Sequence, residues 1–195
     1  MQDEVEEFVF KNTVAYDLLM VTGTGVLSGI IAAALFFLIL RIFKPKIAIS
    51  DKIVKQLRPN RKDGETEYVY KFKFINMSKS DIENVSIDFF LMEDYFNGSA
   101  KNFKTKSLQL AQPEFKFLTG LNNKNHDIHD NCVQMSIREP LEELWDGQKE
   151  WLQVQIDSTH SKSGRRKVHI KNYKDPKNTI SIGKFDSGDN FKIIP

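Results

Sequence analysis

Residues 68–76 read YVYKFKFIN, an alternation that decides the fold class. Aromatic side chains fall on every second position: Tyr68, Tyr70, Phe72 and Phe74. A period of two residues is typical of a β-strand with one buried face, so we expect these four residues in a core. Lys71 and Lys73 then lie on the opposite face, solvated or at an interface. The alternative is that the aromatic stripe forms a stacking platform for bases.

The same period recurs along most of the chain after Pro45. Asn, Gly, Asp and Ser clusters separate the alternating runs, which cover 46–50, 84–92, 115–118, 132–137, 151–157, 167–173, 179–185 and 191–195. Short strands bounded by such turn residues are typical of antiparallel sandwiches and barrels. The sequence therefore predicts a mainly β chain with an antiparallel β-sandwich-like domain.

An uncharged segment precedes this domain. Residues 18–40 contain no charged side chain over 23 positions, and about 20 apolar residues cross the hydrocarbon core as a helix. A cleaved signal peptide is the alternative, but it needs a basic start, and residues 1–17 are acidic. Arg41, Lys44 and Lys46 follow the apolar run, and the positive-inside rule assigns such a flank to the cytoplasm.

These signals predict three parts. Residues 1–17 form an acidic extracytoplasmic N-terminus, residues 18–43 a single transmembrane helix, and residues 44–195 a cytoplasmic β domain. The expected location is the cell inner membrane, with one pass and the N-terminus outside.

Small side chains line one face of the predicted span. Gly25 and Gly29 form a GxxxG motif, and Ala33 extends it by one helical turn. Such a stripe lets two helices approach closely, which predicts self-association. The alternative is that glycine and alanine are simply common in membrane helices.

Positive charge is concentrated in residues 158–177. Seven basic residues face the single acid Asp175 in this segment. Clustered lysines and arginines attract phosphate groups of lipids, nucleic acids or nucleotides. The predicted ligand contacts here are Lys162, Arg165, Arg166, Lys167, His169 and Lys171. A solvated loop that contacts only water or anionic lipid is the alternative.

Three further residues complete the predicted ligand site. Trp151 begins a strand and has a ring that can stack on a base or fill the core. Asn125 and His126 belong to a polar loop suited to base edges or to a plain surface. No duplex DNA or RNA binding is expected.

No catalytic motif stands out, so we expect no enzyme and no cofactor. His126 and His129 with two neighbouring aspartates offer metal-ligand types, but nothing distant completes a coordination set, and we predict no metal site. The single cysteine, Cys132, begins an apolar strand and is expected to be packed.

Three stretches carry a resemblance to inward-rectifier potassium channels. RIFKPKIAISDKIV (41–54) resembles their passage from inner helix to cytosolic sandwich, and KEWLQVQIDS (149–158) and TISIGKFDSGDNFKII (179–194) resemble their later strands. The chain has no pore helix and no selectivity-filter motif, so the resemblance implies only a related strand arrangement.

The whole chain also resembles the small membrane effectors of type III CRISPR systems. The matching features are the apolar helix 25–40, the basic exit 41–46 and the basic element 164–174. The resemblance implies an antiviral homotetramer that binds cyclic tetra-adenylate and opens or perturbs the membrane through its helices. The alternative is a single-pass adaptor whose sandwich docks a protein or anionic lipid.

Overall fold

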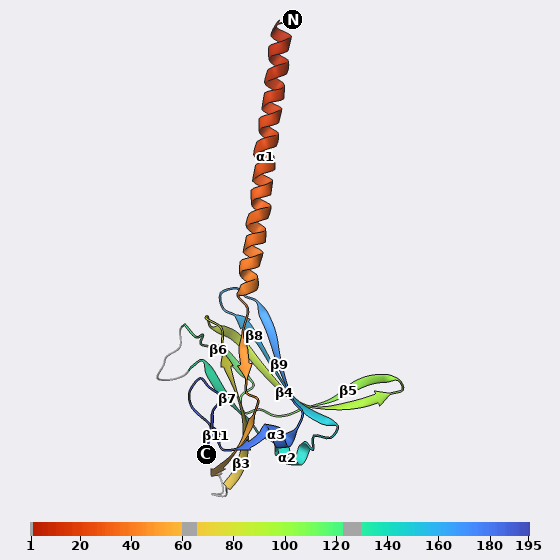
Figure 1. Ribbon diagram of the computed structural model, residues 1–195, viewed down its shortest axis with the longest axis vertical. Coiled ribbons are helices and arrows are strands. Elements are labelled where there is room, and N and C mark those ends of the chain that lie inside the picture. Colours follow the sequence, from red (N-terminus) through yellow and green to blue (C-terminus); the bar gives the residue numbers. More distant parts are fainter. Residues whose placement is uncertain (1, 60–65, 123–129) are drawn as a thin grey trace. The chain divides into compact units, whose positions relative to one another are not determined.

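A computed structural model describes residues 2–59, 66–122 and 130–195 (Figure 1). The chain divides into two compact units, residues 1–42 and 43–195. The mainly β composition, with one apolar N-terminal helix and several antiparallel sheets, confirms the predicted fold class. The acidic residues before the predicted span, for which the sequence predicted neither helix nor strand, belong to the same N-terminal helix as the span.

The first unit is the helix α1 (Gln2–Ile42). Its segment Met20–Ile42 is long and apolar enough to cross a bilayer: 23 residues at ~1.5 Å each exceed the ~30 Å hydrocarbon core. Thr24 and Ser28 donate their hydroxyls to carbonyls of their own helix, at 2.7 Å to Met20 and 2.9 Å to Gly25. These polar groups are thus satisfied without a second helix. Gly25 and Gly29 border open space.

The second unit contains two five-stranded sheets. One sheet comprises β1 (Ile47–Ile49), β2 (Ile53–Pro59), β3 (Thr66–Asn76), β7 (Cys132–Ile137) and β10 (Ile180–Ile182). The other comprises β4 (Ile82–Asn97), β5 (Ala100–Ser107), β6 (Glu114–Leu118), β8 (Glu150–His160) and β9 (Arg166–Tyr173). Neighbouring strands are antiparallel except β10, which runs parallel to β2.

Short elements complete this unit. They are the helices α2 (Leu141–Leu144) and α3 (Pro176–Thr179) and the hairpin of β11 (Lys184–Phe185) with β12 (Ile193–Ile194). The β4–β5 hairpin extends sideways from the sheets (Figure 1). All members of the hydrophobic core lie between Ile47 and Ile180, so residues 43–195 contain a complete core of their own.

The aromatic stripe of β3 is mostly core, as predicted. Phe72 and Phe74 are fully buried, and the Phe72 ring stacks on Phe89 of the other sheet at 5.6 Å between centroids. Tyr68 departs from the prediction, because it is 57% exposed. It lies near the start of β3, before the part of the strand that pairs with β7.

Lys73 also departs from the prediction, because it is fully buried. It is on the face of β3 opposite the core, but the segment between β11 and β12 covers that face. Lys73 Nζ donates to the carbonyl oxygen of Asp186 at 2.7 Å and to that of Gly188. Burial lowers the pKa of this ammonium.

Candidate functional site

The basic residues gather at the turn between β8 and β9. The His160 amide donates to the Arg165 carbonyl at 2.9 Å, and the Gly164 amide donates back to the His160 carbonyl at 2.9 Å. Gly164 has a φ of 65°, a left-handed conformation that glycine adopts without strain. This tight closure leaves Lys162 and Arg165 exposed at the tip.

The turn is attached to the residue that follows α1. Ser163 Oγ donates a hydrogen bond of 2.6 Å to the carbonyl oxygen of Phe43. The Phe43 ring contacts the ring of His160 with 5.7 Å between centroids. Because Phe43 directly follows Ile42, the last residue of the candidate span, the turn lies close to the point where the chain leaves that span.

Exposed basic residues therefore converge from two distant parts of the sequence. Lys44 and Lys46 belong to the link after Phe43 and are exposed. We call the following residues the juxtamembrane cluster: the exposed Lys44, Lys46, Lys162, Arg165 and Arg166, and the partly buried Lys167 near the start of β9. Within this cluster, Arg166 forms an ion pair with Asp157 of β8, which offsets part of the positive charge. That carboxylate raises the pKa of the Arg166 guanidinium.

Other predicted ligand residues of β9 join the two sheets. His169 Nε2 accepts a hydrogen bond of 3.2 Å from the Ile47 amide of β1. Burial, with a smaller contribution from Lys167, lowers the pKa of His169 to about 4, so the ring is neutral at pH 7 and can accept this bond. Lys171 forms an ion pair with Asp51, in the link between β1 and β2.

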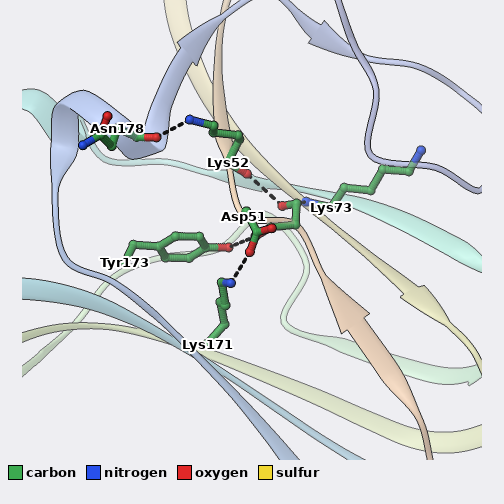
Figure 2. A network of polar contacts seen from close by, with 7 residues as sticks. Asp51, Lys52, Lys73, Lys171, Tyr173 and Asn178 are labelled. Carbon is green, nitrogen blue, oxygen red and sulfur yellow. Dashed lines mark hydrogen bonds and ion pairs between the residues drawn. The ribbon is translucent and has the colours of Figure 1, made fainter.

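Figure 2 shows that the contacts of β9 with the link between β1 and β2 continue beyond Lys171. The hydroxyl of Tyr173 donates to the Ser50 carbonyl at 2.8 Å, and burial raises the pKa of this hydroxyl. On the same link, Lys52 Nζ donates to the Asn178 carbonyl. The side chains of His169 and Lys171 thus connect the edges of the sandwich, and their ligand role stays a prediction.

Trp151 lies far from the turn. It is near the opposite end of β8 from Thr159, which pairs with Arg166. Eight residues of strand separate the two positions, roughly 26 Å at ~3.3 Å per residue. The Trp151 ring instead meets Phe103 of β5 edge-on, at 5.7 Å between centroids. The structure therefore does not bring Trp151 together with the basic turn.

Asn125 and His126 lie outside the described residues, as does His129. Within the ranges 2–59, 66–122 and 130–195, no group of three or more His, Cys, Asp or Glu side chains could hold a metal ion. Cys132 is partly buried beside the segment that covers Lys73, and burial raises the pKa of its thiol.

Sequence reasoning missed Ser163 and Phe43, which define where the basic turn lies. The only local signal was Ser163-Gly164 between two alternating runs, which indicates a turn but not its neighbour. The observations together define the class: a β-sandwich protein with one candidate membrane span among the described residues and a basic turn hydrogen-bonded to the residue that follows this span. No protein-family model matches the chain, and no curated protein matches it either.

Proposed function

We propose that the chain is a single-pass adaptor of the cell inner membrane, with its N-terminus outside and its sandwich in the cytoplasm. The juxtamembrane cluster binds anionic phospholipid headgroups and holds the sandwich at the membrane surface. The Ser163–Phe43 hydrogen bond carries this proposal, because it joins the most basic turn to the residue after the span.

Membrane electrostatics support the proposal. A lysine or arginine near an anionic leaflet contributes about 1 kcal/mol of binding, within a Debye length of ~8–10 Å. The span keeps Lys44 and Lys46 near the surface, and the bond between Ser163 and Phe43 keeps the turn in the same zone. Lipid binding there needs no preformed cavity, since headgroups present phosphates to exposed side chains.

Vesicle binding tests this function. Residues 43–195 contain the complete core and are expected to fold without the span. We expect them to sediment with vesicles containing phosphatidylglycerol and to remain in solution with pure phosphatidylcholine. Equal binding to both vesicles, or to neither, would contradict the proposal.

The second candidate is a membrane effector gated by cyclic tetra-adenylate, acting as a homotetramer with a pore. The Ser163–Phe43 bond favours it too, because a ligand on Arg165 would act within two residues of a contact to the chain leaving the span. The distance between Trp151 and the turn disfavours a site that uses both. Titration of the full chain in detergent with this ligand, compared with Arg165→Glu/Arg166→Glu, separates the two candidates.

A further inference from the structure

The β4–β5 hairpin, the loop before β8 and the end of β9 enclose a hollow of about 740 Å³. Its apolar wall consists of Met92, Phe103 and Trp151. Gln153, Asn172 and three lysines are among its polar lining residues. Cavities of ~300–1,000 Å³ with an apolar wall and a few convergent polar groups are typical of small-molecule sites.

A directed chain of side-chain amides leads into this hollow. Gln155 Nε2 donates to Gln153 Oε1 at 2.6 Å, and Gln153 Nε2 donates to Asn172 Oδ1 at 2.9 Å. The chain leaves the Asn172 NH₂ group as its terminal donor, without an acceptor among the described residues. Each bond in such a chain polarises the next, which strengthens the terminal donor.

More donors surround that amide. Lys149 and Lys174 line the hollow and form no ion pair within the described part of the chain. The Trp151 indole N–H also has no acceptor there. A site that offers several donors without acceptors, two of them ammonium groups, suits an oxyanion, whose oxygens accept only.

The carboxylates of the hollow do not cancel this preference. Asp94 is paired with Lys101 at 2.8 Å. Burial, followed by repulsion from Asp146 and Glu93, raises the pKa of Glu150, so this carboxylate takes up a proton more readily, and protonation removes its repulsion of a bound anion. Three lysines face two carboxylates in the lining.

We propose that this hollow binds a small organic anion, in which a carboxylate or phosphate is attached to a flat ring. Lys149, Lys174 and the Asn172 amide bind the anionic group, and the ring packs on Trp151 and Phe103. Aromatic side chains offer a flat ring both apolar contact and stacking. This site is at the end of β8 away from the juxtamembrane cluster, so it is independent of the proposed lipid binding.

Calorimetric titration of residues 43–195 tests the site with four probes. AMP carries a ring with a phosphate and indole-3-acetate a ring with a carboxylate, whereas adenosine has no anionic group and inorganic phosphate has no ring. We expect at least one ring-bearing anion to bind, and adenosine and phosphate to bind at least ~10-fold more weakly. The stronger of the two anions identifies phosphate or carboxylate as the preferred group.

Variants locate the binding. Lys149→Gln/Lys174→Gln should weaken binding of the anion at least ~10-fold and reduce its dependence on salt. Lys177→Gln/Lys184→Gln removes the same charge elsewhere and should leave binding within about twofold. Both pairs alter exposed side chains, so folding is preserved, and Trp151→Phe provides a further check on ring packing.

Absence of saturable binding up to ~10 mM for both ring-bearing anions would overturn the proposal. Binding that is unaffected by Lys149→Gln/Lys174→Gln would also overturn it. Either result leaves vesicle binding unchanged, so failure of this site is distinguishable from failure of the proposed membrane function.

Discussion

Removing charge from the β8–β9 turn should release the sandwich from anionic vesicles. Lys162 and Arg165 are both exposed at the tip of this turn. At about 1 kcal/mol for each basic residue near the surface, the variant Lys162→Gln/Arg165→Gln loses ~2 kcal/mol of binding. This corresponds to a roughly 30-fold lower partition coefficient.

The assay is sedimentation of residues 43–195 with vesicles containing phosphatidylglycerol, at ~0.1 M salt, where the Debye length is ~10 Å. The matched control is Lys177→Gln/Lys184→Gln, which removes the same charge from exposed positions. Those residues belong to α3 and β11, which lie towards the opposite end of the sandwich from the turn (Figure 1). The control should partition within about twofold of the unmodified domain.

An equal loss in both variants would refute the reasoning, because binding would then follow net charge and not the position of the turn. Unchanged binding of Lys162→Gln/Arg165→Gln would refute it as well. Circular dichroism of each variant verifies that the strands are intact.

Three further predictions concern stability, measured by urea unfolding of residues 43–195. Ser163→Ala removes the bond to Phe43 and should lower the free energy of unfolding by ~0.5–1.5 kcal/mol; no change would mean that the bond does not hold the turn. Phe72→Ala, in the core, should cost ~3–5 kcal/mol, whereas Tyr68→Ala at a 57% exposed position should cost less than ~1 kcal/mol, and similar losses would contradict the described core. The pKa of His169 falls from 6.5 to about 4 on folding, so below pH 6.5 the unfolded chain binds a proton that the folded chain does not. Stability should therefore fall from pH 6.5 towards 4, by ~1–2 kcal/mol after allowance for the partly exposed ring, and His169→Gln should remove this part of the slope.

The strands were predictable because alternation is a local property. YVYKFKFIN states which side chains share a face, and the burial of Phe72 and Phe74 confirms that assignment. It does not state where the core ends or what covers the other face. Tyr68 is exposed because it lies beyond the β7 pairing, and Lys73 is buried because a segment more than 100 residues later covers it.

The candidate site depends on contacts that no local pattern contains. A charge count over residues 158–177 identifies a basic segment, but it treats all seven bases as equivalent. Their positions in the fold differ: Lys171 of β9 pairs with Asp51 at the join between the sheets, whereas Lys162 and Arg165 lie exposed in the turn before β9. Composition also groups Trp151 with these bases, although the length of β8 holds it at the other end. Position along the β8–β9 hairpin, and not charge alone, is therefore what distinguishes the turn proposed to bind lipid from the hollow proposed to bind a small anion.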